Sequence, residues 1–113
     1  MLKKSIFEQI LSGEIDSEIL YEDEDVFAIK DINPVAKIHI LIIPKKKIKT
    51  LNDIKLNDSK LISHMVLVGK KLAKKLKIDK SGYRLIINTN SDAGQSVFHI
   101  HLHLIGGEKL KNI

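Results

Sequence analysis

Apolar residues recur at helical spacing in two stretches of the chain. Ser5-Ile6-Phe7-Glu8 has the pattern of a capping box, with Ser5 as N-cap and Glu8 three residues later. Apolar positions then form one stripe that Gly13 ends. A second stripe recurs every three or four residues from about Asp58 to Lys77, with lysines between. The pattern therefore predicts a short N-terminal helix and one long helix.

Elsewhere the apolar residues follow the spacing and composition of strands. Two short runs flank an acidic stretch and predict a hairpin, and Asp31-Ile32-Asn33-Pro34 then predicts a turn. In a strand over 38–43, alternate side chains face opposite sides, with His39 on one of them. A polar loop over 90–96 separates the last two strands. The order of helix, three strands, helix and two strands predicts an α+β domain on a largely antiparallel sheet. The expected strands are 19–21, 26–29, 38–43, 83–89 and 97–105.

Composition limits the size and class of the protein. The 113 residues, 43% of them hydrophobic, suffice for one domain with a core, which we place over 1–113. A domain this small gains from the extra burial that a partner subunit provides. The absence of cysteine excludes disulfides and thiol chemistry. No apolar stretch fits a signal peptide or a membrane span, so we expect a cytoplasmic protein.

The net charge of +5 favours an anionic ligand. Arg84 is the single arginine, and aromatic residues make up only 4% of the chain. Arginine and exposed aromatic side chains are the residues best suited to phosphate and base recognition along a polynucleotide. We therefore expect a small anionic ligand and no nucleic acid.

Three histidines alternate with apolar residues near the C-terminus. In an extended strand, His99, His101 and His103 share one face, about 6.6 Å apart from one to the next. Imidazoles are neither good core residues nor permanent charges, and their distinctive property is titration near neutral pH. This row is therefore the strongest candidate for chemistry. The residues between them, expected to face the core, are Ile100, Leu102 and Leu104.

Metal binding and nucleophilic catalysis are the two functions that such a row could serve. His99 and His103 would lie about 13 Å apart, too far to share one ion unless the chain bends. Two neighbours together with His39 could do so, but no Asp or Glu stands in or beside the row to support a ligating imidazole. We therefore expect no metal.

A nucleophilic imidazole fits the row better. An imidazole nitrogen attacks phosphorus well, and the resulting phosphohistidine hydrolyses readily. The central residue, His101, has a neighbour on each side that can bind or orient a phosphoryl group. In the preceding loop, Gly94 allows close backbone approach, and the N–H groups around Gln95 and Ser96 can hold phosphate oxygens.

The motif His99-Ile100-His101-Leu102-His103-Leu104-Ile105 resembles the signature of the histidine-triad (HIT) superfamily, in which histidines alternate with apolar residues. The resemblance to the nucleotide-binding HINT branch extends from Ser5 to Gly107. It rests on the segments SIFEQIL, IKDINP, IHILIIPKK and GYRLIINTNSDAGQSVFHIHLHLIGG.

The resemblance implies a purine nucleoside phosphoramidase, which hydrolyses the P–N bond of AMP- or GMP-linked amines. It also implies a HIT-like fold, with a mainly antiparallel five-stranded sheet, two helices and a sheet that continues across a homodimer. No cofactor and no metal are required by the family's mechanism.

The resemblance also assigns roles to individual residues. His101 is the nucleophile, His99 and His103 flank it to contact phosphate and orient it, and His39 lies on the adjacent strand. Asp31 accepts the ribose hydroxyls. The positions that match phosphate contacts are Asn88, Gln95 and Ser96, beside Gly94, and those that match the apolar slot for the base are Ile6, Phe7, Ile10, Ile29 and Ile32.

Other functions remain open at this point. A hydrolase of dinucleoside polyphosphates shares the triad, although Gly106-Gly107 favours the phosphoramidase branch. A non-catalytic nucleotide-binding protein is the alternative of another class. Uridylyl transferases are disfavoured, because they carry Gln where His103 stands. Lys47 departs from the pattern, since many relatives have a histidine there.

Overall fold

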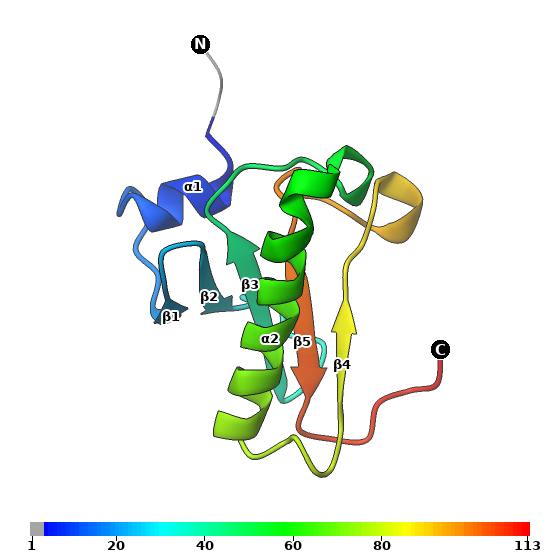
Figure 1. Ribbon diagram of the computed structural model, residues 1–113. Helices are drawn as coiled ribbons and strands as arrows, with labels where there is room; N and C mark the ends of the chain where they lie inside the picture. The colour runs from blue at the N-terminus through cyan, green and yellow to red at the C-terminus, as the bar shows by residue number, and fades with distance from the viewer. Residues whose placement is uncertain (1–3) are drawn as a thin grey trace.

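Five antiparallel strands form one sheet in the order β1-β2-β3-β5-β4 in the computed structural model, which describes residues 4–113 (Figure 1). Two α-helices flank the sheet, and single 3₁₀ turns lie in the loops. The predicted α+β fold is therefore confirmed. The elements are α1 (Ile6–Leu11), β1 (Ile19–Glu22), β2 (Val26–Lys30), β3 (Ile38–Pro44), α2 (Ser59–Lys75), β4 (Tyr83–Ile86) and β5 (Leu102–Gly106), with 3₁₀ turns at Leu51–Asp53, Leu56–Asp58 and Ser91–Ala93.

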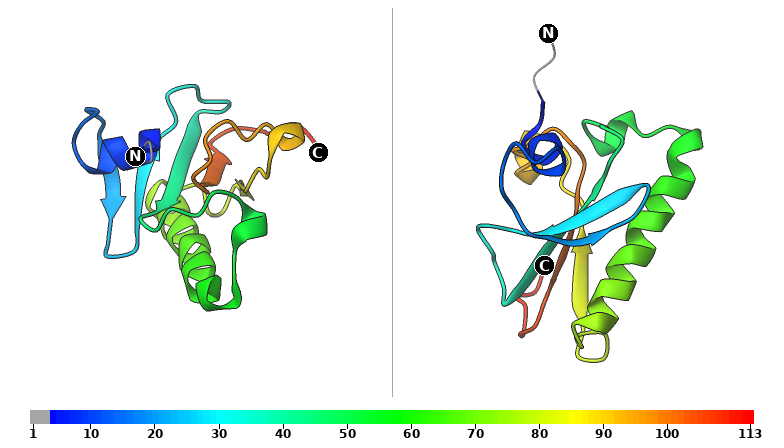
Figure 2. Two further views of the ribbon diagram at one scale, coloured as in Figure 1. Left: turned by 90° about the horizontal axis from the view of Figure 1, so that it is seen from above. Right: turned by 90° about the vertical axis from the view of Figure 1, so that its left-hand side faces the viewer.

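The two faces of the sheet carry different helices. Figure 2 shows α2 running along one side of the sheet. Val26 and Ala28 of β2 face α2 and belong to the larger apolar cluster, whereas Phe27 and Ile29 belong to a smaller cluster with α1. This alternation follows from the two-residue period of a strand. We call the two sides the α2 face and the α1 face.

The N-terminal helix forms as its sequence predicts. The Ser5 hydroxyl accepts the backbone N–H of Glu8, and the Glu8 carboxylate accepts the backbone N–H of Ser5, which completes the capping box. Gly13 follows the helix with a φ of +84°, a conformation that glycine adopts without strain. The α1 helix therefore has a fixed start close to the sheet, where Phe7 and Ile10 are buried.

The last two strands are shorter than predicted. β4 ends at Ile86, and β5 begins only at Leu102, so His99 and His101 precede the strand instead of lying within it. The reason is a change of partner, because the Ile100 N–H donates to the Ile48 carbonyl at 2.7 Å and not to a strand of the sheet. The alternation nevertheless persists, since Ile100 is buried as expected.

No helix within residues 4–113 is both long enough and apolar enough to cross a lipid bilayer.

Candidate active site

Three imidazole rings and one phenyl ring lie side by side on the α1 face. Phe7 comes from α1, His101 from the segment before β5, His103 from β5 and His39 from β3. The ring centroids are 5.0 Å apart for Phe7 and His101, 4.9 Å for His101 and His103, and 5.1 Å for His103 and His39. Leu41 pairs with His103 in the antiparallel register of β3 and β5. His39 lies two residues from Leu41 on the same face of β3, so this register brings His39 and His103 together.

His101 is held as a neutral imidazole with Nε2 free. Its Nδ1 lies 2.8 Å from the His99 carbonyl oxygen, which can only accept a hydrogen bond. The proton of the neutral ring is therefore on Nδ1, and Nε2 carries a free lone pair. Burial lowers the pKa of His101, so the ring stays unprotonated at neutral pH.

His103 holds the opposite tautomer. The Val35 N–H donates to Nδ1 of His39 at 3.1 Å, so the His39 proton is on Nε2. That Nε2–H donates to Nδ1 of His103 at 2.8 Å, which leaves the His103 proton on Nε2. Burial lowers the pKa of His103 to about 4, and the nearby His101 and His39 add to this effect.

Nε2 of His103 is the one buried side-chain polar atom within residues 4–113 that has no hydrogen-bond partner. A buried N–H without an acceptor is costly in free energy. His103 and His101 both line a cleft, so a ligand in that cleft can supply the missing acceptor.

His99 lies behind these rings and does not line the cleft. It is 1% exposed, its Nε2–H donates to the Pro44 carbonyl at 2.8 Å, and its Nδ1 lies 2.9 Å from the Ser5 hydroxyl. Both ring nitrogens are thus occupied, and they join the start of α1 to the end of β3. The predicted phosphate contact of His99 is therefore not supported, whereas its carbonyl does orient His101.

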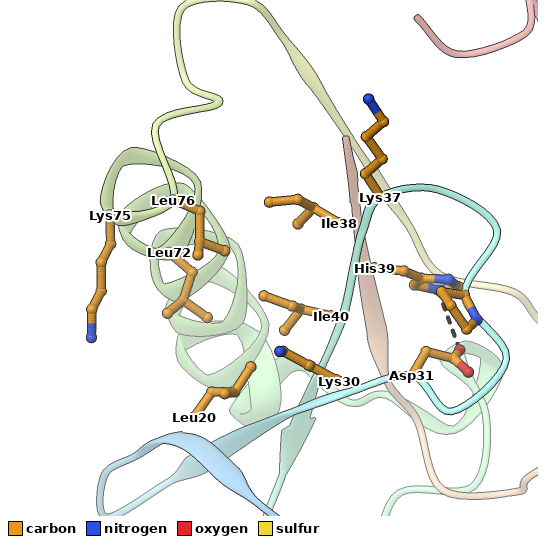
Figure 3. Close-up of a pocket in the computed structure, with 11 residues that line it drawn as sticks. Leu20, Lys30, Asp31, Lys37, Ile38, His39, Ile40, Leu72, Lys75 and Leu76 are labelled. Carbon is orange, nitrogen blue, oxygen red and sulfur yellow. Dashed lines mark ion pairs between the residues drawn. The ribbon is translucent and has the colours of Figure 1, made fainter. Parts of the chain in front are cut away.

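Asp31 stands at the turn after β2, beside the histidines. Its Oδ1 accepts the Asn33 N–H at 2.8 Å, and its Oδ2 lies 3.3 Å from Nε2 of His39 (Figure 3). The sequence showed no carboxylate next to the histidine row, but the fold brings one there. This pairing favours the tautomer in which Nε2 of His39 carries the proton.

The same groups are where a metal ion could bind. Asp31, His39 and His103 each offer one ligand atom, and these atoms lie within 4.8 Å of one another. An ion there would replace the proton shared by the two imidazoles. The expected absence of a metal stays a prediction. Another group with this spacing consists of Asp23, Asp25 and His64.

The cleft has a volume of about 310 Å³ and lies between α1, the turn after β2 and the loop before β5. Its lining includes eleven of the predicted catalytic and binding residues, namely Ile6, Phe7, Ile10, Ile29, Asp31, Ile32, Asn88, Gly94, Ser96, His101 and His103. It also includes residues that were not predicted, namely Ile15, Asp16, Ser17, Lys30, Asn33, Leu41 and Val97. Leu41 could have been found, because it shares the strand face of His39.

The loop before β5 differs in detail from the prediction. Gln95 is buried, its Oε1 accepts the Asn90 N–H at 2.8 Å, and its Nε2 donates to the Lys49 and Val97 carbonyls at 2.7 and 3.1 Å. Its own backbone N–H donates to the Asn90 carbonyl. Gln95 therefore braces the loop and does not line the cleft. Its expected phosphate contact stays a prediction. Ser96 does line the cleft, and no hydrogen bond engages it within the described part of the chain.

Lys47, which departs from the family pattern, lies near the start of α1. Its Nζ is 3.4 Å from Oε1 of Glu8. The pKa of Glu8 is lowered mainly by the hydrogen bond from the Ser5 N–H and further by Lys47. The lysine is therefore part of the packing around the capping box and does not line the cleft.

A larger cavity, of about 410 Å³, lies between α2 and β3 (Figure 3). Its walls are mainly aliphatic, with Leu72 of α2 and Leu76, just after the helix, pointing toward Ile38 and Ile40 of β3. None of the three alternating histidines lines it, but His39 does. His101 and His103 line the smaller cleft, and Asp31 lines both cavities.

Known proteins resemble this chain over nearly its whole length. A family model described as the HIT domain matches residues 12–110. An uncharacterized HIT-like protein of Buchnera aphidicola subsp. Baizongia pistaciae is 49% identical, over 97% of this chain and 98% of its own. The purine nucleoside phosphoramidase of Escherichia coli K12 is 46% identical, over 97% of this chain and 92% of its own.

A solved structure has the same fold. The HIT family hydrolase from Legionella pneumophila Philadelphia 1 superposes with a TM-score of 0.93 and 44% sequence identity, covering 96% of each chain. Together with the family match and the paired tautomers of His101 and His103, this likeness establishes that the chain belongs to the HIT domain family and is a hydrolase of that family.

Proposed function

We propose that the protein hydrolyses the P–N bond of purine nucleoside phosphoramidates, with His101 as the nucleophile. The observation that carries the proposal is the pair of opposite tautomers in one cleft. His101 presents a lone pair on Nε2, and His103 presents an N–H on Nε2 that has no acceptor. A phosphoryl group needs both, an electron pair for phosphorus and a donor for its oxygens.

In the first step, Nε2 of His101 attacks phosphorus as the P–N bond breaks. The ring keeps its Nδ1 proton and becomes cationic, and the His99 carbonyl, 2.8 Å away, stabilises that charge. The leaving nitrogen takes up a proton, which the Ser96 hydroxyl at the cleft wall can relay from solvent. The products are the free amine and a nucleotidyl-His101.

In the second step, water attacks the same phosphorus and the bond to Nε2 of His101 breaks. Its electron pair returns to Nε2, the water releases a proton, and the nucleoside monophosphate leaves. His103 donates a hydrogen bond to a phosphoryl oxygen throughout. A neutral imidazole is too weak an acid to give up its N–H, so His103 acts electrostatically.

The rest of the cleft fits a nucleoside. Asp31 stands next to the histidines, within reach of ribose hydroxyls, and the wall beyond it is aliphatic. Side chains of Ile10, Ile29 and Ile32 line the cleft and offer apolar contact to a base. A relative whose printed name is purine nucleoside phosphoramidase supports the assignment at 46% identity.

Turnover of an adenosine phosphoramidate tests the proposal. His101→Ala should abolish turnover and leave the protein folded, and His101→Asn checks the fold with a polar side chain of similar reach. His64→Ala is the matched control, since His64 lies on α2 away from the cleft and should keep full activity. Unchanged turnover in His101→Ala would refute the mechanism. A diadenosine polyphosphate assayed in parallel should turn over much more slowly than the phosphoramidate.

We also propose that two copies form a homodimer through β4. This strand is an outer strand of the sheet, so its free edge can pair with a second copy. On α2, Val66 and Leu67 are 42% and 58% exposed and offer apolar area for the same interface. Sedimentation should give twice the mass of the chain, and Leu67→Glu should lower it to that of one chain.

A further inference from the structure

The segment from Ile15 to Ser17 forms part of the cleft wall, although the sequence pattern gave it no role. Ile15 packs into the apolar cluster of the α1 face, and its N–H donates to the Gln9 carbonyl at 3.2 Å, which ties the segment to α1. Asp16 and Ser17 follow and line the cleft. They are its first polar residues after α1.

The place of this segment in the chain brings it close to the residues proposed to hold the base. β1 begins at Ile19, which pairs with Ile29, and Asp16 and Ser17 stand just before that strand. Both line the same cleft as Ile10, Ile29 and Ile32, which the proposed function assigns to the base.

The Asp16 carboxylate is open for a ligand. The side chain is exposed, and within residues 4–113 it makes no hydrogen bond or ion pair. Asp31, by comparison, is engaged with the Asn33 N–H and with His39. An ionised carboxylate only accepts hydrogen bonds, and its two oxygens suit two N–H donors on adjacent atoms.

We propose that Asp16 selects guanine over adenine, an inference that rests on the proposed function. The base edge that carries the N1 and exocyclic substituents of guanine offers two adjacent donors, N1–H and N2–H, which match the two carboxylate oxygens. The same edge of adenine has one donor, N6–H. The neighbouring N1 carries a lone pair, and a carboxylate oxygen and this lone pair repel each other. Ser17, with a hydroxyl that donates and accepts, supports either base and does not discriminate.

The expected preference is modest, because Asp16 is exposed to water. Hydrogen bonds to a charged group in such a place are screened, and a difference of about tenfold in Kd between GMP and AMP is the scale to expect. IMP, which keeps N1–H and lacks the exocyclic amine, should fall between them.

Calorimetric titration of the intact protein with GMP, IMP and AMP tests this inference. Asp16→Asn should weaken GMP binding about tenfold and leave AMP unchanged or tighter, since an amide can accept from N6–H and donate to N1. The matched control is Glu18→Gln. Glu18 carries the same charge as Asp16 and stands two residues after it, but its side chain does not line the cleft. It should leave the ratio of GMP to AMP affinity unchanged.

Two results would overturn the role of Asp16 in selecting guanine without affecting the proposed function. One is equal affinity of the unmodified protein for GMP and AMP, and the other is an equal effect of Asp16→Asn and Glu18→Gln on that affinity ratio. Failure of all three nucleotides to bind would overturn the proposed function as well. The ratio of kcat/KM for GMP- and AMP-linked amines should change with Asp16→Asn in the same direction as the Kd ratio.

Discussion

The α2 face and the α1 face of the sheet share strands but have different kinds of contact. On the α2 face, side chains such as Met65, Val68 and Leu104 form a continuous apolar cluster under a 17-residue helix. On the α1 face, a six-residue helix covers only part of the sheet, and hydrogen-bonded imidazoles fill much of the rest. Apolar packing is non-directional, whereas each imidazole contact fixes a ring orientation and a proton position.

In this small domain, one face of the sheet therefore serves mainly stability and the other mainly chemistry. The α2 face can lose or gain a methyl group at a cost in free energy of unfolding without moving a reactive atom. On the α1 face, a lost hydrogen bond changes the tautomer of a neighbour. Substitutions on the two faces should therefore separate the two effects.

The largest expected effect on stability comes from Met65→Ala, because Met65 is fully buried on the α2 face. It should lower the free energy of unfolding by about 2–5 kcal/mol and leave kcat of the folded fraction unchanged. Urea unfolding and a steady-state assay measure the two quantities. Lys70→Ala, at an exposed position of the same helix, is the control and should cost much less. A large fall in kcat for Met65→Ala would contradict the separation.

His103→Leu should have the opposite profile. Loss of the unpartnered Nε2–H removes a donor to the phosphoryl group, so kcat should fall about a hundredfold to a thousandfold. Stability should fall less than in Met65→Ala, because that donor has no partner in the resting protein and Oδ2 of Asp31 remains an acceptor for the Nε2–H of His39. His64→Leu is the matched control. Retained kcat would show that the orphan N–H of His103 plays no part in catalysis.

Stability should depend on pH in acid because of the same residue. The pKa of His103 is about 4 in the folded protein against a reference value of 6.5, so the unfolded chain binds more protons between these values. The free energy of unfolding should therefore decrease as pH falls from about 6.5 to about 4. Burial shifts the pKa of His99 and His101 in the same direction. Urea unfolding across this range should give a shallower dependence for His103→Gln than for the unmodified protein.

The smallest effect is expected for Ser5→Ala, which acts on both stability and chemistry. Loss of the N-cap should cost about 1 kcal/mol, and loss of the contact with Nδ1 of His99 should loosen the carbonyl that orients His101. We expect a modest fall in kcat with little change in KM. Ser12→Ala, at the other end of α1, is the control. Equal kcat in the two variants would limit Ser5 to capping.

The α2 face could be read from the sequence, and the α1 face only in part. The long helix and the alternation of β3 are periodic patterns, so their spacing predicts which residues are buried. The capping box at Ser5 was equally visible. The alternation of the histidines correctly predicted that Ile100 and Leu102 are buried in the core.

Contacts between distant residues were beyond reach of these patterns. His99 is fixed by Ser5 and Pro44, at separations of 94 and 55 residues, and Gln95 braces its loop through Lys49, 46 residues away. Periodicity carries no signal for such pairs, because each forms only when the sheet has assembled. The contact of His64 with Asp23, at 2.7 Å and 41 residues apart, is of the same kind.

The proposed mechanism requires the lone pair on Nε2 of His101 to form a covalent bond to phosphorus. This bond can be detected by intact mass measured after rapid quench with an adenylated amine. The protein should gain the mass of one AMP adduct within a single turnover, and His101→Ala should never do so. Full turnover without any adduct, or an adduct that persists in His101→Ala, would exclude His101 as the nucleophile.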